Sequence, residues 1–229
     1  MKSKVLIIVP AYNEEKSLTK VVNDIEKEAP EVDYIIINDG SKDNTIKMCK
    51  KNKYRYLDSF INLGLWGAVQ TGLKYAMDND YDIAIQFDGD GQHSAKYIKN
   101  LVQAIEEGAD ISIGSRFVDK KKKISLRMLG SRIITACIFL TTGKKITDPT
   151  SGMRAYNKEL IKEYALDMNN PPEPDTLVYM IKRKKKVKEV QVEMNERKEG
   201  VSSFNVEHTI KYMSRMIVSI FFIQPFRRR

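Results

Sequence analysis

Short apolar runs alternate with amphipathic segments along the first half of the chain. The apolar runs have the pattern of parallel strands buried on both faces, and they predict strands at 5–9, 34–37, 83–87 and 110–114, with a weaker one at 54–57. The segments between them predict helices at 15–28, 43–49, 67–77 and 95–107. This alternation predicts an α/β fold with a mainly parallel, doubly wound sheet. A length of 229 residues suits one such domain with a small C-terminal elaboration.

An acidic pair follows one of these predicted strands. Asp88 and Asp90, separated by Gly89, come directly after the apolar run at 83–87. Open α/β sheets bind ligands just beyond the carboxyl ends of their strands. Two carboxylates there can share one divalent cation, and Gly89 allows close backbone approach to a phosphate. The motif therefore predicts a metal and diphosphate site, with a solvated turn as the alternative.

The loops after the first two strands also carry polar residues suited to ligand binding. The first, Pro10 to Glu15, offers an aromatic ring, an amide and carboxylates. The second, Asn38 to Thr45, contains Asp39, which can accept hydrogen bonds from the N–H groups of a base. Each loop also has a simpler interpretation as a helix start, with Asp43 as an N-cap and Glu15 as a first-turn acid.

The charge balance favours an anionic partner. Lysine and arginine number 39 against 30 acidic residues, and the net charge of +9 suits nucleotides, lipid phosphates or a membrane surface. The basic runs at 120–123 and 182–186 are free of aromatic residues, so we expect no nucleic acid partner. The chain enters its first strand without a secretory leader, and we expect a cytoplasmic location.

Two apolar segments flanked by Lys and Arg stand out in the second half. One lies within 124–146, and the other covers 216–223 ahead of three terminal arginines. Neither reaches the roughly 20 apolar residues that a helix needs to cross a bilayer. Such segments are typical of amphipathic helices lying in the headgroup layer, and packing against the core or a dimer partner is the alternative.

Four ordered blocks of the first half share the pattern of one known family. They are Pro10 to Glu15, Asn38 to Thr45, Asn62 to Gly72, and Asp88-Gly89-Asp90 with Gln92. Together they resemble the inverting nucleotide-sugar glycosyltransferases of family 2, which have a GT-A (Rossmann-like) fold. The resemblance implies that the nucleotide is bound by Pro10, Tyr12, Glu14, Asp39, Asp88 and Gly89. It also implies that Asp88, Asp90 and Gln92 surround Mg²⁺ or Mn²⁺, a Lewis acid for the leaving diphosphate.

Three blocks of the second half look like the dolichol-phosphate mannose synthase branch of that family. They are Gly114 to Arg116, Asp148 to Arg154 and Arg197 to Ser203. Members of this branch transfer a sugar to a polyprenyl phosphate, and arginine suits a lipid phosphate because its fork of donors matches the phosphate oxygens. The residues implied for the acceptor phosphate are Arg116, Arg132, Arg197 and Ser203, with Arg127 and Arg154 as second choices.

The implied reaction needs no general base. A phosphate oxygen is already anionic near pH 7, so it can attack the anomeric carbon with inversion, helped by positioning and charge stabilisation. The expected catalytic residues are Asp90, Arg116, Asp148 and Asp175. The segment Glu173-Pro174-Asp175 departs from the mannose synthase pattern and looks like a variant in small bacterial polyprenyl-phosphate transferases. The expected donor is therefore a UDP-sugar such as UDP-GlcNAc, or GDP-mannose.

The expected organisation is a GT-A catalytic domain at 1–205, including the amphipathic segment near 124–146, and a C-terminal amphipathic helix at 206–229. That helix would meet a membrane or mediate oligomerisation. We expect a peripheral enzyme on the cytoplasmic face that serves cell-surface glycan assembly, with a small membrane-anchoring protein or a second copy as partner. Two alternatives remain open. One is a glycosyltransferase acting on a glycan or protein hydroxyl, with Asp148 or Asp175 as base; the other is a non-catalytic nucleotide-sugar-binding protein.

Overall fold

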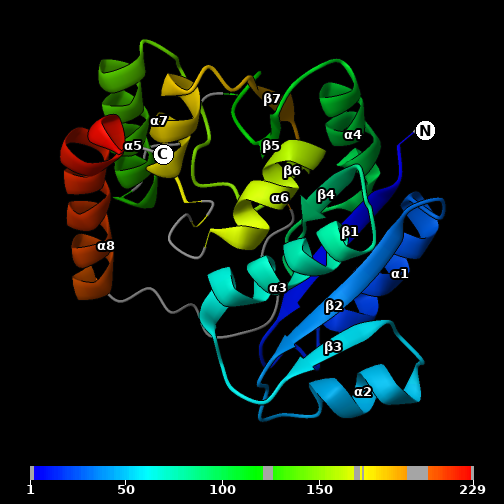
Figure 1. Ribbon diagram of the computed structural model, residues 1–229. Coiled ribbons are helices and arrows are strands. Elements are labelled where there is room, and N and C mark those ends of the chain that lie inside the picture. Colours follow the sequence, from blue (N-terminus) through cyan, green and yellow to red (C-terminus); the bar gives the residue numbers. More distant parts are fainter. Residues whose placement is uncertain (1–2, 121–125, 168–170, 172, 195–205, 228–229) are drawn as a thin grey trace.

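In the part of the chain that the structure describes, seven strands form one mixed sheet. The computed structural model describes residues 3–120, 126–167, 171, 173–194 and 206–227, without the side chains of 126–127 and 206–210. The strands are β1 (Val5–Ala11), β2 (Asp33–Asp39), β3 (Tyr56–Ser59), β4 (Ile83–Gln86), β5 (Ile111–Ser115), β6 (Arg154–Asn157) and β7 (Val187–Gln191). Their order is β3-β2-β1-β4-β6-β5-β7, with β6 antiparallel to both of its neighbours and the other pairs parallel (Figure 1). The predicted α/β, mainly parallel fold is confirmed, and the antiparallel β6 is an addition to it.

Helices cover both faces of this sheet. They are α1 (Leu18–Glu28), α2 (Thr45–Lys51), α3 (Gly64–Asp78), α4 (Ile98–Glu106), α5 (Leu126–Thr142), α6 (Lys158–Leu166), α7 (Thr176–Lys182) and α8 (Val206–Val218). Short helical turns at Ala95–Tyr97, Ser219–Ile223 and Gln224–Phe226 precede α4 and follow α8. The predicted helix at 15–28 begins three residues late, at Leu18, because residues 15–17 form a turn. The helix predicted at 67–77 begins three residues early, at Gly64.

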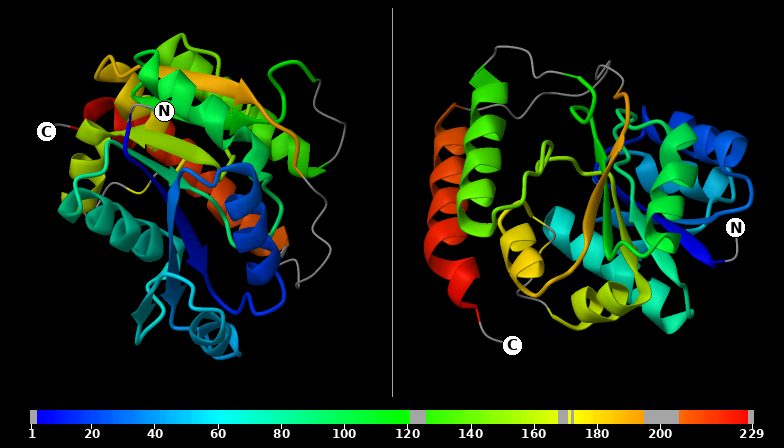
Figure 2. Two further views of the ribbon diagram at one scale, coloured as in Figure 1. Left: turned by 90° about the vertical axis from the view of Figure 1, so that its right-hand side faces the viewer. Right: turned by 90° about the horizontal axis from the view of Figure 1, so that it is seen from above.

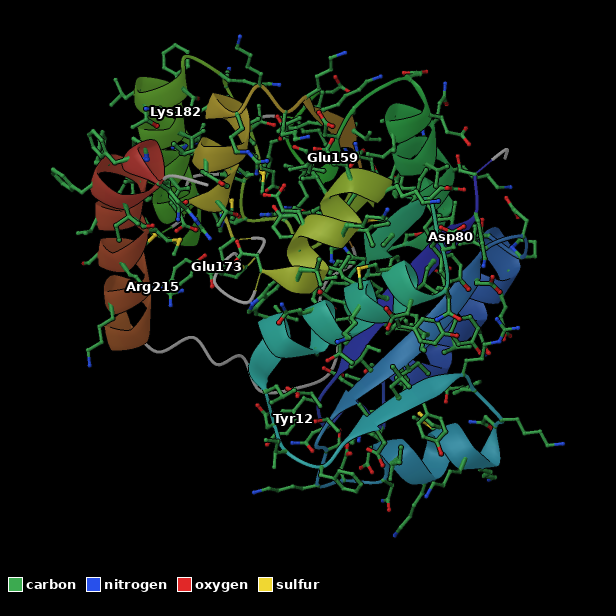
Figure 3. The ribbon with its side chains drawn as sticks, viewed as in Figure 1. Tyr12, Asp80, Glu159, Glu173, Lys182 and Arg215 are labelled. Carbon is green, nitrogen blue, oxygen red and sulfur yellow. The ribbon has the colours of Figure 1, made fainter. Side chains whose placement is uncertain are left out.

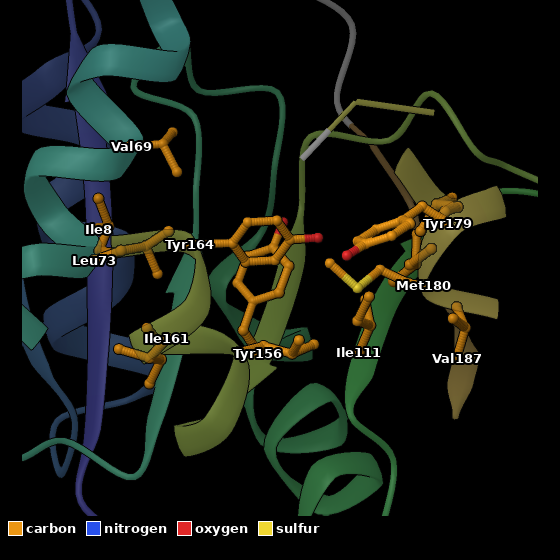
Figure 4. Packing of buried hydrophobic residues seen from close by; sticks show 14 of the residues in the cluster. Ile8, Val69, Leu73, Ile111, Tyr156, Ile161, Tyr164, Tyr179, Met180 and Val187 are labelled. Carbon is orange, nitrogen blue, oxygen red and sulfur yellow. The ribbon is translucent and has the colours of Figure 1, made fainter. Parts of the chain in front are cut away.

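The sheet divides the buried apolar side chains into two clusters. Successive residues of a strand point to opposite faces, so in β1 Ile7 packs with α1, α2 and α4, while Ile8 packs with α3 and α6. Both side chains are fully buried, as the continuous apolar run predicted. Figure 4 shows part of the second cluster, where Tyr156 and Tyr164 meet edge to face with ring centroids 5.2 Å apart. Burial of each such large side chain contributes roughly 1.5–3 kcal/mol.

Helices α5 and α8 lie side by side at the end of the molecule far from β3 (Figures 1 and 2). Their inner faces join the core, where Ile134 and Ile138 of α5 and Met216 of α8 are buried, and Ile220 in the turn after α8 is buried with them. Their outer faces expose large apolar side chains, including Leu140 at 72%. Within the described residues, none of the helices combines the length and the apolar character that a bilayer crossing requires.

Candidate active site

The loops after β1 and β2 interlock through hydrogen bonds. Asn13 accepts a bond from the backbone N–H of Lys42 (2.8 Å) and donates its own backbone N–H to the hydroxyl of Ser41 (2.9 Å). The Glu15 carboxylate accepts bonds from both the backbone and side-chain nitrogens of Asn44 (2.9 and 3.0 Å). Glu15 therefore links the two loops through hydrogen bonds. It does not lie in the first turn of α1, where the simpler interpretation placed it.

Asp43 also joins the two loops. Its carboxylate accepts the backbone N–H of Thr45 at 3.0 Å and that of Glu15 at 3.1 Å. Burial alone would raise the pKa of Asp43, but the hydrogen bonds from Thr45 and Glu15 outweigh it and hold the pKa below its ordinary value. The N-cap residue of α2 is Asn44, whereas the simpler interpretation gave this position to Asp43. Asp43 stabilises the start of the helix from the residue before the N-cap.

A cavity of about 400 Å³ opens between these loops and the end of β4. Its wall contains all the residues predicted for the nucleotide, namely Pro10, Tyr12, Glu14, Asp39, Asp88 and Gly89. Tyr12 lies at the exposed edge (Figure 3), whereas Asp39 is buried and accepts the backbone N–H of Leu63 at 2.7 Å. The loops of β2, β1 and β4 meet here because these strands are neighbours in the sheet.

Asp88 lines two cavities. It lines the 400 Å³ cavity together with Asp90, and it lines a second cavity of about 310 Å³ together with Gln92. Gly89 packs against the neighbouring strand, since a Cβ atom there would lie 2.8 Å from the carbonyl oxygen of Pro10. Gly89 thus allows the close approach of β1, and because it also lines the 400 Å³ cavity, its approach to a phosphate stays a prediction.

The Asp88 carboxylate is held in place from several sides. His93, which is buried, contacts one oxygen through Nε2 at 3.2 Å, and Gln86 donates to the other at 3.3 Å. Burial raises the pKa of Asp88, but the hydrogen bond and charge of His93 outweigh it and keep the pKa below its ordinary value. Gly152 covers the same carboxylate so closely that a Cβ atom would lie 2.3 Å from Oδ2.

The acidic loop offers hard oxygen ligands suited to Mg²⁺ or Mn²⁺. Two carboxylates and one amide, from Asp88, Asp90 and Gln92, lie around the junction of the cavities, and Asp90 accepts the backbone N–H of Gln92 at 3.0 Å. No group of three or more His, Cys, Asp or Glu side chains in the described residues could hold a metal by itself. Asp88, Asp90 and Gln92 fit a cation such as Mg²⁺, which is usually bound by one or two carboxylates together with substrate phosphates and water.

The second cavity combines a polar floor with an apolar roof. Its floor includes Arg116 and the loop at 150–152, and its roof comes from α5, α8 and the chain after β7. The roof residues are Met128, Ser131, Ile134, Met194, Tyr212 and Met213. None of them was predicted for the site, because apolar residues at helical spacing in a sequence are normally interpreted as residues of the hydrophobic core. His93 also lines this cavity, and its only signal in the sequence is its place one residue after Gln92.

Arg116 and Asp148 form a tight pair at this cavity. The guanidinium donates Nε and Nη2 to the two carboxylate oxygens at 2.7 and 2.8 Å, and the backbone N–H of Arg116 donates at 3.1 Å. Asp148 is completely buried, whereas the Arg116 side chain is 23% exposed. The structure thus joins two of the predicted catalytic residues in one unit.

The other predicted basic residues are distributed differently. Arg132 lines a third cavity of about 830 Å³, together with Phe117 and Phe139. Arg154 is buried and donates to the carbonyl oxygens of Pro149 and Ser151 at 2.6 and 2.9 Å, so it shapes the loop that follows Asp148. Residues 197 and 203, and the side chain of residue 127, lie outside the described part of the chain.

Asp175 lies outside the residues that line the two cavities joined by Asp88. It is buried at the start of α7, where its Oδ2 accepts bonds from Ser219 (2.5 Å) and Gln224 (3.1 Å). The nearby Glu173 pairs with Arg215 of α8 at 2.7 Å, and Figure 3 shows these two side chains facing one another. This acidic segment therefore fastens the C-terminal helices to α7, and the structure does not bring it to Asp88 and Arg116.

The sheet order and the acidic loop beyond β4 define a GT-A (Rossmann-like) glycosyltransferase fold. Residues 6–165 match the family model "Glycosyl transferase family 2", and the chain belongs to this family. It is 35% identical over 179 residues to the UDP-N-acetylglucosamine–dolichyl-phosphate N-acetylglucosaminyltransferase of Methanococcus voltae, covering 69% of this chain and 71% of that protein. It is 27% identical to the polyprenol monophosphomannose synthase of Mycolicibacterium smegmatis, covering 71% and 65%.

Solved structures of glucosyl-3-phosphoglycerate synthase from Mycobacterium tuberculosis share the fold. A complex with uridine diphosphate aligns with a TM-score of 0.74 at 16% identity, over 99% of this chain and 82% of that chain. A complex with Mg²⁺ and uridine diphosphate aligns with a TM-score of 0.71, also at 16% identity, over 100% and 81%. The predicted family and fold are therefore confirmed.

Proposed function

We propose that this chain is an inverting glycosyltransferase that moves a monosaccharide from a nucleotide-diphosphate sugar to a polyprenyl phosphate. The observation that carries the proposal is the pair of cavities that share Asp88, one lined by the nucleotide-type loops and the other by Arg116. A donor in the first cavity would direct its diphosphate to the acidic loop. The sugar would then lie at the junction, within reach of an acceptor phosphate in the second cavity.

On the donor side, Tyr12 and Asp39 would contact the nucleoside, and Asp88, Asp90 and Gln92 would hold Mg²⁺ or Mn²⁺ against the diphosphate. The cation would neutralise the negative charge that develops on the leaving nucleoside diphosphate. His93 and Gln86 would keep the Asp88 carboxylate in its orientation throughout.

On the acceptor side, Arg116 would bind and orient the phosphate. A phosphate oxygen forms a bond to the anomeric carbon while the bond from that carbon to the diphosphate oxygen breaks, so the electron pair leaves with the nucleoside diphosphate. No proton has to be removed. A hydroxyl acceptor would need a carboxylate base, but Asp148 accepts three bonds from Arg116 and Asp175 accepts bonds from Ser219 and Gln224. These engagements favour a phosphate acceptor, with Asp148 as a positioning residue and Asp175 in a structural role.

A lipid acceptor requires access to a membrane, and the same helices that roof the second cavity carry the exposed apolar faces. On α5 these include Leu129 and Leu140, and after α8 they include Phe222 and Ile223. We propose that this surface lies in the headgroup layer on the cytoplasmic face, where the net positive charge favours anionic lipids. A second copy or a small membrane-anchoring protein would cover part of the same surface.

The donor is proposed as UDP-GlcNAc or GDP-mannose, for the assembly of a cell-surface glycan. The names of the two relatives, one using UDP-N-acetylglucosamine and one making polyprenol monophosphomannose, support both.

The test is to incubate the protein and Mg²⁺ or Mn²⁺ with UDP- and GDP-sugars, with and without undecaprenyl phosphate, and to analyse the lipid fraction by mass spectrometry. A lipid-phosphate-hexose mass that is lost in Asp90→Asn is the expected result. Asp80→Asn is the matched control, because Asp80 is 84% exposed and pairs only with Lys158 among the described ion pairs (Figure 3). Donor turnover that yields sugar on a soluble glycan, and none on the lipid, would refute the proposed acceptor.

A further inference from the structure

Strand β7 contributes two side chains that reach the segments around Arg116. Glu189 and Gln191 are two residues apart and so lie on the same face of the strand. The Glu189 carboxylate accepts three bonds, from the backbone N–H of Thr147 (2.7 Å), the hydroxyl of Thr147 (2.8 Å) and the backbone N–H of Asp148 (2.8 Å). It therefore fixes the backbone of the segment that carries Asp148.

Gln191 holds the segment on the other side of the pair. Its side-chain oxygen accepts the backbone N–H of Asp119 at 2.9 Å, and its side-chain nitrogen donates to the carbonyl oxygen of Arg116 at 3.2 Å. The same nitrogen donates to the carbonyl oxygen of Val192 at 2.9 Å. The chain from Arg116 to Asp119 is thus tied to β7 at two points.

Strand β7 therefore holds the backbone of both members of the Arg116–Asp148 pair. Asp148 orients the guanidinium through three bonds, and Glu189 orients Asp148 through the two backbone N–H groups at 147 and 148. A guanidinium binds a phosphate well only when its planar fork faces the oxygens, so the orientation of Arg116 decides its affinity for the ligand. Support from a rigid strand is what such a site requires.

We propose that Glu189 and Gln191, here called the β7 pair, are positioning residues that hold Arg116 in the orientation needed to bind the acceptor phosphate. This inference rests on the proposed function, in which Arg116 contacts that phosphate. The β7 pair does not touch the reacting atoms and acts only through Asp148 and the backbone of Arg116. Glu189 makes the larger contribution, because its charge strengthens each of the three bonds that it accepts.

The decisive variant is Glu189→Gln. The amide keeps the shape but replaces one acceptor oxygen with an NH₂ group, which faces a backbone N–H and leaves it without an acceptor. The lost bond is partly buried and has a charged acceptor, and phosphate binding must then restore the orientation of Arg116 against a cost of up to roughly 1.5–3 kcal/mol, which corresponds to about a 10- to 150-fold effect. We therefore expect the KM for undecaprenyl phosphate to rise by roughly tenfold or more. We expect kcat to fall less than threefold and the Kd for the nucleotide with Mg²⁺ to stay within twofold, which correspond to less than about 0.7 and 0.4 kcal/mol.

Glu107→Gln is the matched control, since Glu107 pairs with Lys188 of the same strand at 2.5 Å and touches neither segment at Arg116. It removes the same charge beside β7, and its KM should equal that of the unmodified protein. A general loss of stability in Glu189→Gln would weaken the binding of both substrates, whereas a loss of positioning weakens that of the acceptor alone.

A double-mutant cycle with Arg116→Ala separates positioning from other roles. In the Arg116→Ala background, Glu189→Gln should change the acceptor KM by less than about twofold, because the side chain that it orients is gone. An equal effect of Glu189→Gln in both backgrounds, or no effect on the acceptor KM in the presence of Arg116, would overturn the inference while leaving the proposed function intact. If Arg116→Ala itself leaves the acceptor KM unchanged, or no sugar reaches the lipid phosphate, the proposed function fails and the role of the β7 pair fails with it.

Discussion

Gly152 is the position where one methyl group should disturb the site most. A Cβ atom there would lie 2.3 Å from Oδ2 of Asp88 and 3.1 Å from its Cγ. Because ordinary contacts between such atoms are about 3.5 Å, Gly152→Ala requires a displacement of about 1 Å. Asp88 should be the group that moves. It is held by bonds of 3.2 and 3.3 Å, whereas buried Arg154 holds the Gly152 loop through bonds of 2.6 and 2.9 Å.

The size of the effect follows from this displacement. A shift of about 1 Å in a positioning group can cost about 100-fold in rate, which equals about 2.7 kcal/mol of transition-state stabilisation. The free energy of unfolding should change by less than about 1 kcal/mol, since the strain is released by a side chain at a cavity wall. We therefore expect Gly152→Ala to fold normally and to lose most of its turnover.

Calorimetric titration with UDP and GDP tests this without knowledge of the sugar. The increase in nucleotide affinity produced by Mg²⁺ or Mn²⁺ should be lost in Gly152→Ala, while the metal-free affinity should be unchanged. Gly130→Ala is the control, because it adds a methyl group to the opposite wall of the second cavity at 3.2 Å from the flexible Met213 side chain. The reasoning is refuted if both variants lose equally the increase in nucleotide affinity produced by the metal. It is also refuted if Gly152→Ala is destabilised by 1–3 kcal/mol, about the cost of an overpacked interior, with its metal response intact.

Three further predictions concern stability, membrane contact and the metal. Asp43→Asn should lower the free energy of unfolding by about 1 kcal/mol at pH 7. Since the folded-state pKa of Asp43 is below its ordinary value, this difference should persist above the unfolded pKa and vanish as the pH falls through the folded pKa, as urea titrations between pH 7 and 2.5 can test. Phe222→Glu should weaken binding to anionic vesicles by about tenfold in a sedimentation assay, and Phe60→Glu, at an exposed apolar position near β3, should not. Chelation by EDTA should abolish lipid-linked product, and Mg²⁺ or Mn²⁺ should restore it; full turnover in EDTA would exclude the metal assignment.

The part of the site built from strand ends was predictable from the sequence. Apolar runs mark the strands, and in a doubly wound sheet the carboxyl ends of neighbouring parallel strands meet at one edge. Pro10 and Asp39 lie at the carboxyl ends of two such strands and Asp88 lies just beyond a third, so their convergence on one cavity required only the order of the strands.

The antiparallel strand β6 was not predictable in the same way. It has four residues, two of which are Arg154 and Asn157, and such a short polar segment has no periodic signal. Its place between β4 and β5 depends on contacts with residues more than 40 positions away. The partners of Asp175 lie 44 and 49 residues further along the chain, so local sequence could not distinguish a structural carboxylate from a catalytic one.

The interlocked loops after β1 and β2 limit how this enzyme can be recombined with its relatives. Each loop supplies acceptors for backbone N–H groups of the other, as Asn13 does for Lys42 and Asp43 does for Glu15. A chimera that exchanges only one loop would leave several of these donors unmatched, whatever nucleotide preference the new loop brings. The two loops are therefore one structural unit, and a graft that gives this scaffold a different nucleotide preference should transfer residues 10–17 and 40–45 together.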